Sequence, residues 1–284
     1  MREPFLGSAA LAAGDLTRHQ LRSRFVAVHH DVYVSKRTEL TAIIRARAAW
    51  LRTRGHGILA GFSASALHGA KWVDATMPAT AIDTNRRRTT GMVVWSANIS
   101  EDEVCVIDGM RVTTAGRTAV DLARRYPLDT AVAAIDALAR ATRLETAEIE
   151  SAARRHPGRQ GRKRALNVLS LVDRGAESPR ETWLRLVVVR AGYPRPETQL
   201  PVCNEYGALI GIVDLGWRDP KIAMEYEGKH HRMSRERFDK DIRRIDEMRE
   251  QGWNVIRVTA MDTEATIERR LARAWGLYRP VSSG

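Results

Sequence analysis

The stretch ALIGIVDLGWRDPKIAMEYEGKHH, residues 208–231, decides the fold of the C-terminal part of the chain. Its two apolar runs, Ala208–Leu215 and Ile222–Glu227, have the composition of adjacent β-strands. Side chains two positions apart on a strand point to the same face. Glu225 and Glu227 are therefore expected to emerge together, while the residues that alternate with them face a core.

Asp214 ends the apolar row of the first run, on the same face as Ile210 and Ile212. An acid in that place, beside two more acids on the next strand, is unfavourable near an apolar core unless it has a partner. Clustered carboxylates repel one another, and a bound cation is the simplest relief. The three acids predict a divalent-metal site of the kind that hydrolyses phosphodiesters.

The flanking segments complete a small α/β domain with a mixed central sheet. Apolar residues at helical spacing predict a helix over Arg235–Gln251, and Ser178 with Pro179 fits the N-cap and first turn of another. The further elements are predicted as helix Pro179–Ala191, strand Thr198–Cys203, strand Asn254–Thr259 and helix Thr263–Trp275.

The charge of the chain indicates a polyanionic partner. It has 46 Lys and Arg against 34 Asp and Glu, a formal charge of +12 and a pI near 10.3. Such an excess is typical of nucleic-acid binders. The alternative is that the charge only keeps the protein soluble.

The N-terminal segment has the pattern of a winged helix-turn-helix. Two short helices, Phe5–Ala13 and Arg18–Arg24, precede strands that flank His29-His30-Asp31 as a hairpin. The second helix would enter the major groove of DNA. The residues predicted to contact DNA there are Arg18, His19, Arg22 and Arg24. The alternative is a small capping subdomain with no nucleic-acid partner.

The middle of the chain is predicted as an α/β unit that follows a helix over Glu39–Arg54. Asp108-Gly109 is a hairpin signal, the helix after Ile58 is expected to be capped near Ser63, and helices are expected at Arg117–Arg125 and Leu128–Thr142. Two basic segments are predicted to contact phosphates or, alternatively, to be solvated loops. Their residues are Arg86, Arg87, Arg88, Arg162, Lys163 and Arg164.

The fold class is therefore α/β in the broad sense, an α+β multidomain chain. The predicted domains are a winged helix with its connecting helix over 1–54, a middle α/β domain over 55–150, a basic linker over 151–176 and the nuclease-like domain over 177–284. Cys105 and Cys203 lack zinc or disulfide spacing. With no signal peptide and no membrane-length apolar run, we expect a cytoplasmic protein that has no membrane partner.

The C-terminal pattern resembles the PD-(D/E)xK nuclease core, and more narrowly a Vsr-like domain. The resemblance covers Ala176–Asp262 and rests on E-x-E-G-x-x-H at Glu225–His231, on Asp241 and Arg244, and on GWNVIRVT at Gly252–Thr259. It implies a restriction-endonuclease-like mixed sheet flanked by helices, with Mg²⁺ or Mn²⁺ as cofactor.

The resemblance also implies roles for single residues. Asp214 and Glu225 would be the principal metal ligands, and Glu181 would approach from the first helix, in preference to Glu177. Glu227 occupies the position where many family members keep a lysine. A glutamate there can accept a proton from water or hold a second cation. The missing positive charge would come from a residue just past the strand, either Lys229 or His230.

Residues 1–150 resemble the N-terminal and middle parts of AbiEi-type antitoxins. The resemblance rests on the winged-helix pattern, on FSASALHG at Phe62–Gly69 and on VTTAGRTAVDLA at Val112–Ala123. The sequence thus leads to two hypotheses about function. The first is a metal-dependent DNA endonuclease with an N-terminal DNA-binding domain, acting in mobile-element defence or DNA processing.

The alternative is a DNA-binding transcriptional regulator of the antitoxin type that retains a nuclease fold as a scaffold. The glutamate at the lysine position favours it. DNA is the expected partner in both hypotheses, and a toxin or a second copy of the chain stays open as a protein partner. A third possibility, a structural protein that binds other proteins, predicts no DNA affinity at low salt.

Overall fold

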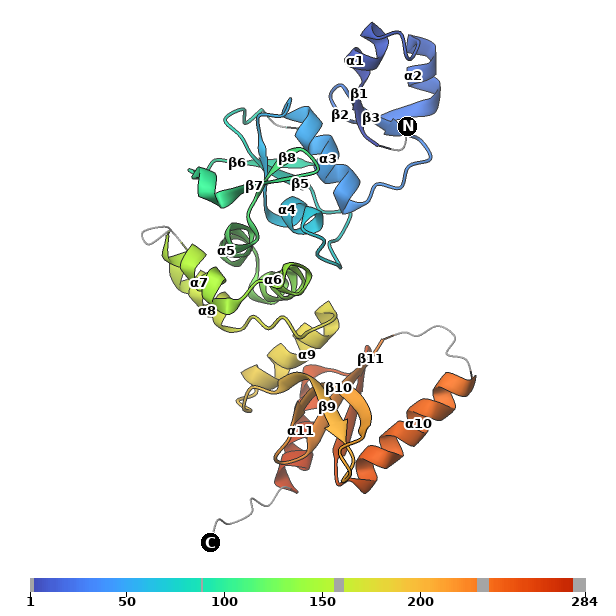
Figure 1. Ribbon diagram of the computed structural model, residues 1–284, viewed down its shortest axis with the longest axis vertical. Helices are drawn as coiled ribbons and strands as arrows, with labels where there is room; N and C mark the ends of the chain where they lie inside the picture. Colours follow the sequence, from blue (N-terminus) through green and yellow to red (C-terminus); the bar gives the residue numbers. More distant parts are fainter. Residues whose placement is uncertain (1–2, 88, 156–160, 229–234, 278–284) are drawn as a thin grey trace. The chain divides into compact units, whose positions relative to one another are not determined.

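The computed structural model describes residues 3–87, 89–155, 161–228 and 235–277, without the side chains of 235–238. Two compact units make up the chain, Met1–Arg174 and Gly175–Gly284 (Figure 1). The described residues form three sheets and the helices around them, which confirms the α+β multidomain class. The division of the first unit at residue 54 stays a prediction. No helix in the described part of the chain is both long and apolar enough to cross a membrane.

The first unit begins with a three-stranded sheet of order β1-β3-β2 and two short helices. Thr17 caps α2 in a reciprocal capping box with Gln20, which starts the helix where the sequence predicts it. The predicted helix over Phe5–Ala13 starts later, because Phe5 and Leu6 pair with the third strand. The elements are β1 (Phe5–Leu6), α1 (Gly7–Ala12), α2 (Arg18–Arg24), β2 (Phe25–His29) and β3 (Val32–Ser35).

A five-stranded sheet of order β6-β5-β4-β8-β7 forms the middle of this unit. The Asp108-Gly109 hairpin is confirmed, with Ile107 opposite Met110 and both turn residues at positive φ. β5 and β6 pair in parallel. The elements are α3 (Ala42–Arg52), β4 (Ile58–Leu59), α4 (Gly61–Leu67), β5 (Ala79–Ile82), β6 (Met92–Trp95), η1 (Glu101–Glu103), β7 (Val104–Ile107) and β8 (Met110–Thr113).

Four helices close the first unit, and one of them lies where a basic linker was predicted. The bounds of the linker stay a prediction, and α8 packs against α5, α6 and α7 within the compact unit Met1–Arg174. The reason is an apolar stripe at helical spacing, in which Ala165, Val168 and Leu169 are buried. The helices are α5 (Ala115–Arg125), α6 (Leu128–Thr142), α7 (Thr146–Arg154) and α8 (Arg162–Ser170).

The second unit is a four-stranded mixed sheet of order β12-β11-β10-β9, in which only β11 and β12 are parallel. α9 and α11 cover one face through a core that includes Leu184, Met224 and Leu271. α10 lies over the other face, where Met248 is buried (Figure 1). The elements are α9 (Pro179–Arg190), β9 (Glu197–Cys203), β10 (Leu209–Trp217), β11 (Ile222–Glu227), α10 (Arg235–Glu250), β12 (Asn254–Thr259) and α11 (Glu264–Gly276).

Candidate functional site

Asp214 lies where strands β10 and β11 part. The ladder between the two strands ends at the pair Leu215 and Met224, so the backbone N–H of Tyr226 has no ladder partner on β10. The Asp214 carboxyl accepts a hydrogen bond from this N–H at 2.7 Å. The side chain therefore takes the place of a strand carbonyl, which gives this residue a structural role.

The acids on β11 face arginines rather than open space. Arg244 of α10 donates to both oxygens of Glu225, at 2.5 and 2.9 Å. Arg244 also binds Asp241 at 2.6 Å, and Asp241 accepts from Arg257 of β12 at 3.0 Å. Arg257 forms an ion pair with Glu227 as well. The cavity that these residues line, of about 430 Å³, thus holds three carboxylates paired with two arginines on this side, before Asp214 is counted.

Glu181 is engaged at the N-terminus of α9. Ser178 caps the helix as predicted, and its hydroxyl donates to the Glu181 carboxylate at 2.8 Å. The same carboxylate accepts from the Glu177 backbone N–H at 2.8 Å and from the Gln199 amide at 3.2 Å. These three hydrogen bonds hold the carboxylate at the N-terminal end of the helix.

The surroundings of Asp214 destabilise the charged form of its carboxyl group. The pKa of its carboxyl is raised from 3.8 to about 7, chiefly by burial and also by the negative charges of Glu181, Glu225 and Glu177, against the hydrogen bond from the Tyr226 N–H. Glu181 and Glu225, the two other predicted metal ligands, are therefore close enough to act electrostatically on Asp214. At neutral pH the Asp214 carboxyl is close to its titration midpoint.

In the structure, the predicted metal ligands are engaged by other groups of the protein. Among the residues that the structure describes, no three His, Cys, Asp or Glu side chains converge as a metal site requires. Glu225 is held by Arg244, and Glu181 by its three hydrogen bonds at the start of α9. Lys229 and His230, the predicted sources of positive charge, lie outside the described residues.

Arg257 is the functional-site residue that the sequence did not single out. It lies between the buried Ile256 and Val258 in a strand, and its side chain reaches the carboxylate face. The signal that could have identified it is a cation that interrupts an apolar strand on the face of two predicted acids. Asp241 and Arg244, which belong to the pattern of the resemblance, buttress the strand of Glu225 through these contacts.

The second helix of the winged segment presents a basic surface. Arg18, His19, Arg22 and Arg24 are all exposed, although Leu21 between them is buried. Within the described part of the chain, no carboxylate forms an ion pair with any of these arginines. Lys36 adds a cation next to this helix, because its ammonium group donates to the Arg22 carbonyl at 3.0 Å.

The two other basic segments are also exposed where they are described. Arg86 and Arg87 follow β5, and Arg88 lies outside the described residues. The second segment, Arg162–Arg164, forms the exposed first turn of α8. Arg164 donates to the carbonyl of Tyr126, so this segment is a helix start and not a loop.

Comparison with known proteins finds one matching domain family and two relatives of the chain. A family model, the AbiEi antitoxin C-terminal domain, matches residues 30–171, which is half of the chain. Two relatives from Mycobacterium tuberculosis, strains CDC 1551 / Oshkosh and H37Rv, are each 29% identical over 268 residues, which is 91% of this chain and 96% of the relative. Both are named only as uncharacterized proteins. No solved structure matches the chain.

Proposed function

The chain belongs to the AbiEi antitoxin C-terminal domain family, and from this premise we propose that it is a DNA-binding regulator of the antitoxin type. The observation that carries the proposal is the exposed basic surface of α2, whose arginines have no carboxylate partner within the described residues. Membership of an antitoxin family points to a toxin as the protein partner, and we include such a partner in the proposal.

The geometry of α2 supports docking on duplex DNA. Arg18 and Arg22 are one helical turn apart, so they project from the same side of the helix. The adjoining hairpin of β2 and β3 is the wing of a winged helix, and the second helix is the element that reads the major groove in such motifs. A net charge of +12 adds long-range attraction for phosphates.

The second unit supports the regulator over the enzyme. Its acids are bound by Arg244, by Arg257 and by the hydrogen bonds at the N-terminal end of α9. A metal-dependent nuclease needs carboxylates that are free to coordinate. We propose that this sheet serves as a scaffold that descends from a nuclease-like fold.

The double variant Arg18→Ala/Arg22→Ala is expected to bind duplex DNA at least roughly tenfold more weakly at physiological salt, because each substitution removes a cation that binds a phosphate or a base. The slope of log K against log salt should fall by about one unit for each phosphate that is no longer neutralised. Fluorescence anisotropy with a labelled promoter fragment at several salt concentrations measures both quantities.

The matched control is Arg269→Ala/Arg273→Ala, which removes the same two positive charges from exposed positions on α11. If this control binds duplex DNA with wild-type affinity, the loss in the α2 variant is due to a local interaction and not to the lower net charge. Wild-type affinity in the double variant would rule out α2 as the docking helix.

A second candidate function is the metal-dependent endonuclease of Vsr-like type. The observation in its favour is the raised pKa of Asp214, since the surplus negative charge around it is what a cation relieves. Mg²⁺ or Mn²⁺ would be the cofactor, with Asp214, Glu225 and Glu181 as ligands, after Arg244 releases Glu225.

This candidate predicts cleavage of supercoiled plasmid in Mg²⁺ or Mn²⁺ that disappears in Asp214→Asn and in Glu225→Gln. Titration calorimetry with MnCl₂ is the companion measurement, because it detects the cation without requiring activity. Absence of both cleavage and Mn²⁺ binding would leave the regulator as the function of this chain.

A further inference from the structure

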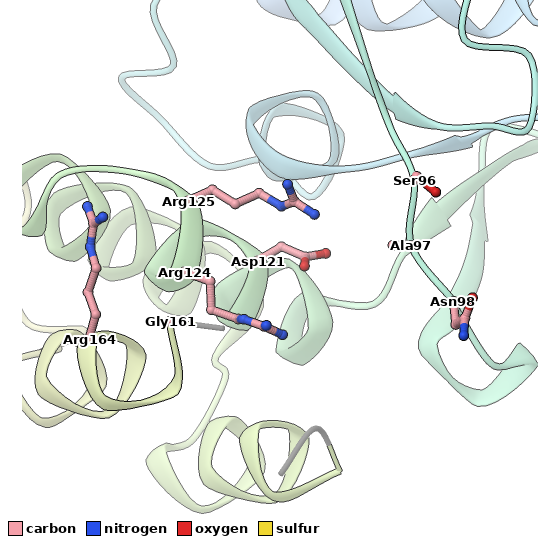
Figure 2. A pocket seen from close by; sticks show the side chains of 8 residues that line it. All are labelled: Ser96, Ala97, Asn98, Asp121, Arg124, Arg125, Gly161 and Arg164. Atoms are coloured by element: carbon pink, nitrogen blue, oxygen red, sulfur yellow. The ribbon is translucent and has the colours of Figure 1, made fainter. Parts of the chain in front are cut away.

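We propose that a basic cavity in the first unit is a binding site for phosphate groups, separate from the α2 surface. The cavity has a volume of about 740 Å³ and lies between the segment after β6, the C-terminal end of α5 and the start of α8 (Figure 2). The side chains that give it its chemistry are Ser96, Asn98, Asp121, Arg124, Arg125 and Arg164.

Three arginines from two helices contribute to the wall. Arg124 and Arg125 belong to the last turn of α5, and Figure 2 shows both side chains extended toward the segment Ser96–Asn98. Arg164 comes from the first turn of α8. Since these helices are neighbours, the cations are brought together by the fold and not by the sequence alone.

The guanidinium group of Arg125 is held in place before any ligand binds. Its central carbon lies 4.0 Å from the centroid of the Trp95 ring, and Trp95 is buried. Stacking occupies one face of the guanidinium plane and leaves the N–H groups at its edge for an acceptor. A planar fork fixed in this way suits a phosphate, which accepts two hydrogen bonds side by side.

A fourth cation reaches the rim of the cavity. Arg86, on the loop after β5, donates to the hydroxyl of Ser96 at 3.1 Å. Arg86 and Ser96 follow the carboxyl ends of the parallel strands β5 and β6, which explains why residues ten positions apart meet here.

The acid of the cavity is outnumbered by these cations. Asp121 is the one carboxylate among the described residues of the lining, and it already accepts a hydrogen bond from the buried Arg117 at 2.9 Å. Arg117 in turn binds Glu103 at 2.7 Å. The two acids and Arg117 together carry one net negative charge, against three arginines in the wall and a fourth at the rim.

The ligand that this chemistry recognises is a phosphate group carried by a larger molecule. The volume exceeds the space that a single phosphate ion occupies and falls in the range of sites for drug-sized molecules. Ser96 and Asn98 add neutral donors and acceptors on the wall opposite the arginines (Figure 2). A free nucleotide and the backbone of a nucleic-acid strand both supply such phosphates.

The test uses the full chain with three probes at low salt: inorganic pyrophosphate, ATP and a duplex of mixed sequence. The double variant Arg125→Ala/Arg164→Ala removes two of the cations. A second variant, Ser96→Glu, puts a carboxylate at an exposed rim position, so it competes with the phosphate without disturbing the core. The matched control is Arg154→Ala, an exposed arginine of α7 that forms an ion pair with Glu150 and does not line the cavity.

Both variants are expected to weaken binding of at least one probe by roughly tenfold or more, while the control keeps wild-type affinity. A free nucleotide as ligand gives saturable ATP binding at one site per chain that both variants lose, with duplex affinity unchanged. Nucleic-acid backbone as ligand gives a loss of duplex affinity with a shallower salt slope, and no tight ATP binding.

Wild-type affinity of both variants for all three probes would overturn the proposal, as would a wild-type chain that binds none of them. These failures are distinct from a failure of the proposed function. The function fails when substitution of Arg18 and Arg22 leaves duplex binding intact, a result that the cavity variants do not influence.

Discussion

Replacing Arg117 by methionine will destabilise the first unit by roughly 3 to 5 kcal/mol, the range for a broken buried ion pair. The side chain of Arg117 is 2% exposed and binds Glu103 at 2.7 Å and Asp121 at 2.9 Å. Methionine fills a similar volume but leaves two buried carboxylates without their cation. Urea denaturation followed by circular dichroism measures the change in the free energy of unfolding of this unit.

The compensated variant is the control for this prediction. Glu103→Gln and Asp121→Asn, combined with Arg117→Met, remove the orphaned charges and should recover a large part of the stability, because apolar or neutral replacements of buried ion pairs are tolerated. A destabilisation below about 1 kcal/mol in the single variant would mean that water or another cation reaches the acids.

Replacing Asp214 by asparagine will stabilise the second unit at pH 8 by roughly 2 to 4 kcal/mol, because a raised carboxyl pKa disfavours the charged form of the folded state. The folded pKa is about 7 and the reference value is 3.8. Between these values the folded chain holds a proton that the unfolded chain has released. The contribution of the wild-type carboxyl is therefore fully present below pH 3.8 and is lost as the pH rises through about 7.

Melting temperatures of the wild type and of Asp214→Asn at pH 5 and pH 8 check the sign. The gain should be large at pH 8 and should shrink as the pH is lowered, since both carboxyl and amide are then neutral. Glu205→Gln, at an exposed position beside the β9–β10 turn, controls for the removal of one negative charge. An asparagine variant that is less stable at pH 8 than the wild type would show that the charged carboxylate has a favourable partner.

Local patterns in the sequence predicted strands of the second unit and one hairpin of the first unit. The strands Ile222–Glu227 and Asn254–Thr259 have the bounds that alternation and apolar content predicted. The Asp108-Gly109 hairpin followed from turn chemistry, which involves only neighbouring residues. Such features depend on side chains within a few positions of one another, so a single sequence contains the information.

Features that depend on distant residues were missed. The parallel pairing of β5 with β6 is a choice between partners, and strand composition alone does not make it. α7 carries a mixed polar pattern and was not predicted. The predicted cap of α4 near Ser63 lies instead at Ala60, because the hydroxyl of Ser63 is buried and accepts from the Thr80 N–H at 2.9 Å.

The candidate site also combines features that neighbouring residues determine with features that distant residues determine. The sequence identified which acids lie on the exposed face of β10 and β11, and these acids do line one cavity. The partners of the acids come from α10 and β12, at positions 244 and 257. Whether a carboxylate faces an arginine or a bound metal ion depends on how a helix lies over the sheet, and hydrophobic periodicity does not specify that.

The attachment of α10 to its sheet changes character along the helix. At Asp241 and Arg244 the contact is ionic, whereas Ile245 and Met248 are buried against apolar residues. Dissolved electrolyte screens the first kind of contact, and strongly hydrated salts strengthen the second. Sodium sulfate therefore acts in opposite directions on the two halves of the helix: it weakens the ionic contact, to a degree limited by its partial burial, and strengthens the apolar one.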